Sequence, residues 1–237
     1  MFHLESNSSD VTGPKDRPVK LIHHWTFDYI ASVSNIKDSV TGRGVRLFGT
    51  PRLSSVGEKK LNKFLQLKGR SSLDLGNLQG CASNIDKCKN GFTLGFWLRQ
   101  RLRRQQVVII GNIQPGQNTN GFRLMTYQTK FFLRINTKSG SEVCTYQAGL
   151  GTWKYHVIIW HGDDVSVYVD NVPAKIDKRF IPGGGGRSET TAPLMIGRPN
   201  FRIDADFDDI TFWDGAMESE QIEKLLTPSL GKWMDNF

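Results

Sequence analysis

The sequence predicts an all-β protein in which two antiparallel sheets pack as a jelly-roll sandwich, with one short helix near the C-terminus. Short segments rich in β-branched and aromatic residues recur at intervals of about ten residues, as in sandwiches. Only residues 217–226 show a helical pattern, with Ile222, Leu225 and Leu226 on one face. In addition, one segment, residues 91–99, is uncharged on both of its faces until Arg99.

The segment at residues 91–99 is the centre of this prediction. Phe92, Leu94 and Phe96 fall at every second position, which is typical of a β-strand with one buried face. The alternate face carries Thr93, Gly95 and Trp97 and is not polar either. Such a strand belongs in the middle of a sheet that is covered on both sides, so two layers are expected.

Other strands follow from the same patterns. No linker interrupts them after Val19, so residues 19–237 are expected to form a single domain behind a flexible N-terminal segment, residues 1–18. The expected strands are residues 21–29, 61–67, 72–76, 106–111, 121–127, 130–136, 153–160, 165–170, 194–197 and 208–213.

The composition argues against a membrane-spanning protein and favours a polyanionic partner. The chain has 237 residues and a net charge of +8. No apolar run approaches the roughly 20 residues that cross a bilayer, so no membrane insertion is expected. No leader sequence is recognisable at Met1, which fits an intracellular protein or one trimmed of its signal. The basic charge favours polyanionic partners, although an excess of charge can also serve solubility alone.

The three cysteines are informative by their positions. Cys81 and Cys88 have six residues between them in a loop-like stretch, so they can be a disulfide or two free thiols, and we expect the disulfide. No CxxC pattern or nearby histidine favours a metal there. Cys144 then has no partner within the chain, and it is expected to be a buried thiol or to form a disulfide with another molecule. Asn7 begins an Asn-Ser-Ser glycosylation sequon, which matters only in a secreted protein.

Seven landmarks along the chain occur in an order that resembles laminin-G-like and pentraxin-like domains of the concanavalin A-like jelly-roll superfamily. The cysteine pair before the aromatic strand is similar to that of the pentraxin-like domains of adhesion-type receptors. This resemblance implies a secreted protein or the extracellular part of a membrane protein. The landmarks are WTFD (25–28), FLQLKG (64–69), GFTLGFW (91–97), WKYHV (153–157), VYVDN (167–171), MIG (195–197) and FDDITFW (207–213).

The resemblance also implies a structural calcium ion. At the matching positions of this chain, the ligands of the ion would be Asp38 with Asp208 or Asp209. Neighbouring residues of a strand point to opposite faces, so only one of the latter two is expected to reach the ion. The alternative is an acidic sheet edge that discourages pairing with other sheets.

No catalytic site is expected. Glycoside hydrolases of this architecture place paired carboxylates on one strand as E-x-D-x-x-E. Here Asp204, Asp206 and Asp208 have strand spacing but no glutamate among them. His23 and His24 would point to opposite faces of a strand, so they are not expected to share a ligand.

The basic run after the central strand is the expected polyanion site. If the strand continues, Arg99, Arg101 and Arg103 share one face at intervals of about 6.7 Å and can meet sulfate groups, with Arg104 facing away. The alternative is a hairpin tip with solvated charges. Nucleic acid is not expected, because the aromatic residues are expected to be buried.

Together these features predict a non-catalytic extracellular recognition module. Its expected partner is a cell-surface or matrix protein, or an acidic glycan such as heparan sulfate. The alternative is a lectin-like or hydrolase-like jelly roll that acts on sugars.

Overall fold

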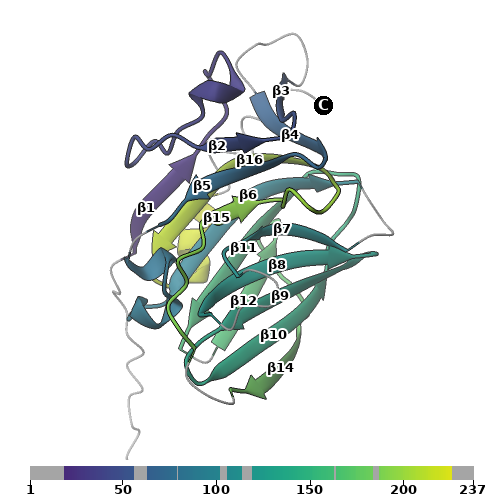
Figure 1. The fold of residues 1–237 in the computed structure, drawn as a ribbon. Helices are drawn as coiled ribbons and strands as arrows, with labels where there is room; N and C mark the ends of the chain where they lie inside the picture. Colours follow the sequence, from purple (N-terminus) through teal and green to yellow (C-terminus); the bar gives the residue numbers. More distant parts are fainter. Residues whose placement is uncertain are drawn as a thin grey trace, which may run out of the picture.

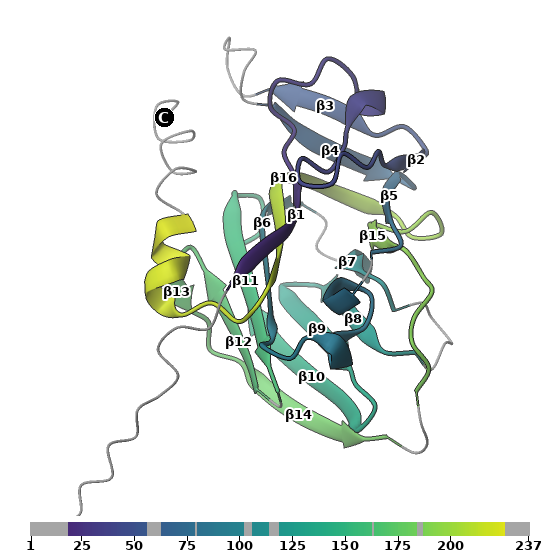
Figure 2. The same ribbon diagram turned by 90° about the vertical axis from the view of Figure 1, so that its left-hand side faces the viewer.

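The structure is a computed structural model that describes residues 19–55, 63–78, 80–101, 106–113, 119–162, 164–183 and 187–225. Sixteen strands form two antiparallel eight-stranded sheets, stacked face to face (Figures 1 and 2). The predicted sandwich is therefore confirmed.

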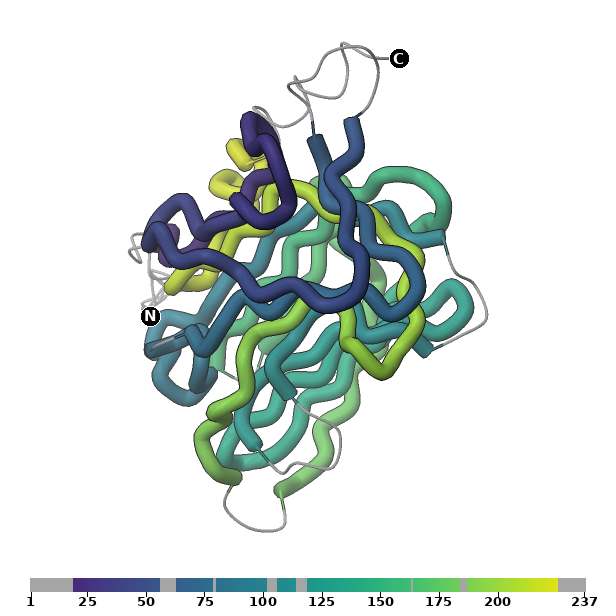
Figure 3. Tube along the Cα trace, turned by 45° about the horizontal axis from the view of Figure 1, so that its top comes forward, coloured from purple at the N-terminus to yellow at the C-terminus, as the bar shows by residue number. Residues whose placement is uncertain are grey.

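Sheet I has the order β13-β12-β11-β6-β16-β4-β3, with β1 also paired to β16. Its strands are β1 (Lys20–Trp25), β3 (Arg52–Ser55), β4 (Lys63–Gly69), β6 (Phe92–Gln100), β11 (Lys154–His161), β12 (Asp164–Val169), β13 (Val172–Pro173) and β16 (Ile203–Asp214). Because β1 pairs with β16, the two ends of the described chain lie side by side, purple beside yellow in Figure 3.

Sheet II has the order β14-β10-β9-β8-β7-β15-β5-β2. Its strands are β2 (Arg46–Phe48), β5 (Ser72–Gly76), β7 (Val107–Gly111), β8 (Gly121–Tyr127), β9 (Lys130–Asn136), β10 (Gly140–Gln147), β14 (Asp177–Pro182) and β15 (Leu194–Ile196). Sheet II lies toward the viewer in Figure 1.

Strand β6 lies between β11 and β16, in the middle of sheet I, and both of its faces are covered. The inward face packs in the core between the sheets, where the Phe92 and Phe212 rings stack with centroids 5.3 Å apart. On the outward face, Trp97 belongs to a second apolar cluster with Tyr155 and Ile222. Ile222 comes from the helix at residues 219–225, which covers this side of the sheet (Figure 2). The predicted double coverage is confirmed.

The loop before β6 is built from two short 3₁₀ turns, Gly80–Ala82 and Ile85–Lys87. Another such turn, Val33–Asn35, follows β1. None of the helices among the described residues is long and apolar enough to cross a bilayer.

Candidate functional site

The predicted disulfide is present. Cys81 and Cys88 are bonded, with Cα atoms 4.6 Å apart, and the bond joins the two 3₁₀ turns before β6. Cys144 is a free, buried thiol. Burial raises its pKa to about 12, which keeps it protonated and unreactive at neutral pH.

Asp38, the first expected calcium ligand, is already saturated with donors. Its Oδ1 accepts hydrogen bonds from the main-chain N–H groups of His24 (2.9 Å) and Val40 (3.0 Å). Its Oδ2 accepts one from Thr41 Oγ1 (2.5 Å) and lies 2.7 Å from His23 Nδ1. Burial opposes ionisation of this carboxyl, but these hydrogen bonds outweigh it and lower the pKa of Asp38. The carboxylate thus organises the loop that follows β1.

Asp208 and Asp209 lie at a β-bulge of strand β16, where the register shifts and Asp209 has a φ of 43°. Asp208 Oδ1 accepts the main-chain N–H of Asp209 at 2.9 Å. Asp209 Oδ1 lies 3.4 Å from Nε2 of His24, the residue whose main chain contacts Asp38. The bulge therefore brings Asp209 and Asp38 to the same histidine.

We propose that these residues hold no calcium ion. Calcium takes six to eight oxygen ligands, whereas the Asp38 oxygens are occupied and the group beside Asp209 is an imidazole nitrogen. Within the described ranges, no group of three or more histidine, cysteine or acidic side chains is placed to hold a metal ion.

We therefore expect the melting temperature to be the same with excess calcium as with EDTA, since a ligand stabilises only a protein that binds it. Differential scanning calorimetry at constant ionic strength checks this. A lower melting temperature in EDTA, restored by calcium, would contradict it.

The first two arginines of the expected polyanion site are held by carboxylates on the neighbouring strand. Arg99 Nε donates to Asp206 Oδ2 at 2.7 Å, and both terminal nitrogens of Arg101 also bond Asp206. Arg101 reaches Asp204 at 3.2 Å as well. Asp206 itself is fully buried. Two negative charges thus neutralise the guanidinium pair.

Arg99 is further enclosed by aromatic rings, because its Cζ lies 5.3 Å from the Phe64 ring centroid and 5.0 Å from that of Trp153. Arg103, Arg104 and Asn7 lie outside the described residues. The geometry gives Arg99 and Arg101 a structural role in sheet I.

The outward face of sheet II carries a second set of arginines. Leu124 and Leu133 are core residues, so the alternating positions Arg123 on β8 and Arg134 on β9 point outward. These two arginines are direct cross-strand partners. Like charges in this position repel each other and destabilise a sheet.

Two further arginines join this pair. Arg134 and Arg187 both donate to Ser141 Oγ, at 3.1 Å and 2.9 Å, which places their guanidinium groups side by side. Arg198, which is buried, donates to the Ile113 carbonyl at 2.9 Å, near strand β7. We call Arg123, Arg134, Arg187 and Arg198 the arginine cluster.

Two members of the cluster carry guanidinium nitrogens that lack an acceptor. The Nε atoms of Arg123 and Arg198 are buried without a hydrogen-bond partner. Among the described residues, no ion pair involves Arg123, Arg134 or Arg198.

Burial, and after it the charge of a neighbouring arginine, lowers the pKa of three members of the cluster. Arg134 is that neighbour for Arg123 and Arg187, and Arg123 is that neighbour for Arg198. Arginine stays charged nonetheless. A bound carboxylate or sulfate would relieve this repulsion.

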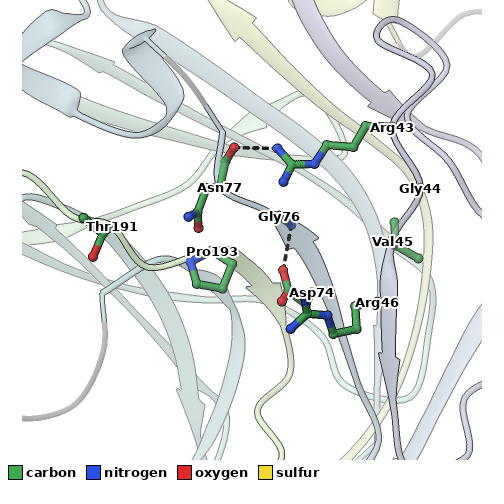
Figure 4. Close-up of a pocket in the computed structure, with 9 residues that line it drawn as sticks. All are labelled: Arg43, Gly44, Val45, Arg46, Asp74, Gly76, Asn77, Thr191 and Pro193. Carbon is green, nitrogen blue, oxygen red and sulfur yellow. Dashed lines mark hydrogen bonds between the residues drawn. The ribbon is translucent and has the colours of Figure 1, made fainter.

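A polar cleft of about 550 Å³ lies at the β2 end of the same sheet (Figure 4). Its arginines are Arg43, which donates to the Asn77 carbonyl at 2.7 Å, and Arg46 on β2. The guanidinium of Arg43 lies against Gly76, where a Cβ would come within 2.6 Å of Arg43 Cζ. The cleft's one acidic residue is Asp74, which accepts the Gly76 N–H at 2.8 Å.

Among the described residues of this face, no carboxylates are paired as they are in glycosidases. On the described outward positions of sheet II, the acidic residues are Asp74 on β5 and Asp177 on β14. Six strand spacings separate these strands, about 29 Å. Glycosidase carboxylates lie about 5–10 Å apart.

Sequence reasoning missed the arginine cluster, although a signal for its central pair was available. The expected strands at residues 121–127 and 130–136 leave a two-residue turn, and such a turn fixes the register of a hairpin. That register places Arg123 opposite Arg134. Arg187 and Arg198 reach the face from connecting segments, and no local pattern marks them.

Comparison with known proteins identifies the family of the chain. A laminin G family model, described as the concanavalin A-like lectin/glucanases superfamily, matches residues 76–223, more than half of the chain. No curated protein matches the chain.

Solved structures with this fold include the receptor binding domain of botulinum neurotoxin C/D mosaic serotype, with a TM-score of 0.65 and 12% identity over 87% of this chain and 50% of that one. Domain 4 of AbnA, a GH43 extracellular arabinanase from Geobacillus stearothermophilus, in complex with arabinotriose, has a TM-score of 0.63 and 16% identity, over 88% of this chain and 99% of that one. The binding domain of botulinum neurotoxin DC in complex with SialylT has a TM-score of 0.65 and 12% identity, over 87% of this chain and 50% of that one.

The chain therefore spans about half the length of the neurotoxin domains, and at these identities the likeness is one of fold. The matched family model extends from the end of β5 to the helix that covers sheet I. This chain belongs to the concanavalin A-like lectin/glucanases superfamily.

Proposed function

We propose that this chain is a non-catalytic recognition module that binds an acidic glycan on the outward face of sheet II. One observation carries the proposal: Arg123 and Arg134 are direct cross-strand neighbours, with no carboxylate of the described chain paired to either. Guanidinium groups bind sulfates and carboxylates through two parallel hydrogen bonds, so such a pair suits sulfated or uronic sugars.

The surroundings of the pair suit a sugar better than a folded protein. Half-buried Met125 and Phe132 are outward cross-strand partners on the same two strands, and apolar side chains of this kind pack against the C–H faces of sugar rings. Two structures of the same fold were solved with saccharide-type ligands, arabinotriose and SialylT. A protein partner is the second candidate.

The proposed setting is outside the cell, on a secreted protein or in the extracellular part of a membrane protein. The Cys81–Cys88 disulfide supports this setting, because disulfides persist in oxidising compartments. Partners there include cell-surface and matrix components such as heparan sulfate.

The double variant Arg123→Gln/Arg134→Gln tests the site. We expect its affinity for heparin to fall at least tenfold, since losing one hydrogen bond to a charged group costs about 1.5 kcal/mol or more. The free energy of unfolding should stay equal or rise, because the substitution removes a like-charge cross-strand pair. Isothermal titration calorimetry and urea unfolding measure the two quantities.

The matched control is Arg52→Gln/Lys68→Gln, which removes the same number of positive charges from exposed positions of sheet I. We expect this control to retain heparin affinity within about twofold at physiological salt, where distant charges are screened. Equal losses in both variants, or no heparin binding by the wild type, would refute the proposed site.

A further inference from the structure

We propose that the ligand is a linear polyanionic glycan that lies across the strands of sheet II, along one row of paired residues from Arg46 to Arg179. This inference rests on the proposed function and adds the form of the ligand and its direction on the sheet. The row follows directly from the register of successive strands. Its members, from β2 to β14, are Arg46, Asp74, Met195, Gly111, Arg123, Arg134, Val143 and Arg179.

The row is long and carries positive charge at both ends and at its centre. Seven strand spacings separate β2 from β14, about 34 Å in all. Arg46 and Arg179 are exposed at its two ends, and Arg123 and Arg134 are half-buried in the middle. A single acidic sugar covers one of these positions, whereas an extended chain meets all of them at once.

One end of the row opens into the polar cleft of Figure 4, where Arg43 and Arg46 are found with Asp74. Asp74 is directly opposite Arg46 and accepts the Gly76 N–H. Its negative charge disfavours an anionic group at β5, and its second oxygen is a suitable acceptor for a sugar hydroxyl. The row thus favours a chain whose anionic groups flank an uncharged stretch.

The middle of the row provides the strongest demand for an anion. Gly111 and Met195 are both buried, and a Cβ at Gly111 would lie 2.5 Å from the Phe122 carbonyl oxygen and 2.6 Å from Arg123 Cα, so β8 packs closely on β7 at this point. Arg198 donates to the carbonyl oxygens of Gly111 and Ile113, and its Nε has no partner. Acidic groups of the ligand would then be held at half-buried Arg123, beside this buried section.

A second row runs parallel to the first and is mostly apolar. Val108, Met125, Phe132 and Thr145 are successive cross-strand partners on β7 to β10. An arginine row beside an apolar row is complementary to a polysaccharide, which presents charged substituents along one side and C–H faces along another.

The test uses two heparin fragments, one with an extended length below half of the row and one just longer than the row. The wild type should bind the long fragment at least tenfold more tightly than the short one, at one protein per chain. The end variant Arg46→Gln/Arg179→Gln should lose most of this gain and keep its affinity for the short fragment within about twofold, since the central pair remains.

The outcomes separate this inference from the proposed function. If the end variant keeps the full long-fragment gain, the row is wrong, although the central site stands. If Arg123→Gln/Arg134→Gln leaves the affinity for both fragments unchanged, the proposed function fails as well. Equal affinity for a polyglutamate of the same length would overturn the assignment of a glycan.

Discussion

The substitution Asp206→Ala is expected to lower the free energy of unfolding by about 3 kcal/mol. Its carboxylate is fully buried and bonds both Arg99 and Arg101. Removing it leaves Arg99, which is enclosed by aromatic rings, without its counter-charge, and leaves Arg101 with Asp204 alone. Breaking a buried pair costs about 3–5 kcal/mol, and partial access of the arginines to water places this case at the lower end.

The control for this prediction is Asp204→Ala. Asp204 makes one ion pair with Arg101 at 3.2 Å, and its side chain is 28% exposed, so its loss should cost less than about 1 kcal/mol. Urea unfolding at pH 7 measures both variants. Equal destabilisation of the two would show that the buried network does not hold β6 against β16.

Acidification is expected to destabilise the protein below about pH 6.5 through His156. Burial lowers the pKa of this histidine to about 3. Its ring stacks 5.2 Å from the Phe96 ring, and its Nδ1 lies 3.1 Å from the Tyr146 hydroxyl. Between about pH 6.5 and 3 the unfolded chain binds a proton that the folded chain refuses, so stability falls as pH falls, at up to about 1.4 kcal/mol per pH unit.

The double variant His156→Phe/Tyr146→Phe isolates this contribution, because it removes the histidine and also the hydroxyl that would lose its partner. Between pH 6.5 and 4.5 we expect a flatter dependence of unfolding free energy on pH than in the wild type. Urea unfolding at several pH values measures the two slopes. Identical slopes would contradict a neutral, buried His156.

The strands that could be predicted are those with apolar side chains at alternate positions. Strands β8 and β9 have the expected bounds, and the central strand extends two residues past the expected apolar run, to Gln100. Strand β14 was missed because all six of its residues are exposed at the edge of sheet II, so no apolar pattern marks it. Strand β16 begins at Ile203, earlier than the expected residue 208, and Arg99 and Arg101 neutralise the aspartates in its first part.

The functional residues were harder to predict than the strands, because a charge acquires its role from its neighbours. The run that begins at Arg99 is prominent in the sequence, yet its described members face Asp206 across the sheet. Arg123 is an isolated basic residue in the sequence, and only the register of sheet II brings Arg134 beside it. Patterns along the chain locate strands, whereas ion pairs between distant strands decide which charges remain for a ligand.

We propose that an acidic glycan binds at Arg123 and Arg134, and not at Arg99 and Arg101. Arginine Nε–Hε resonances in ¹H–¹⁵N spectra, recorded during titration with a short heparin fragment, test it most directly. We expect saturable shifts for Arg123 and Arg134, while the resonances of Arg99 and Arg101 stay in place. Shifts confined to Arg99 and Arg101 would contradict it.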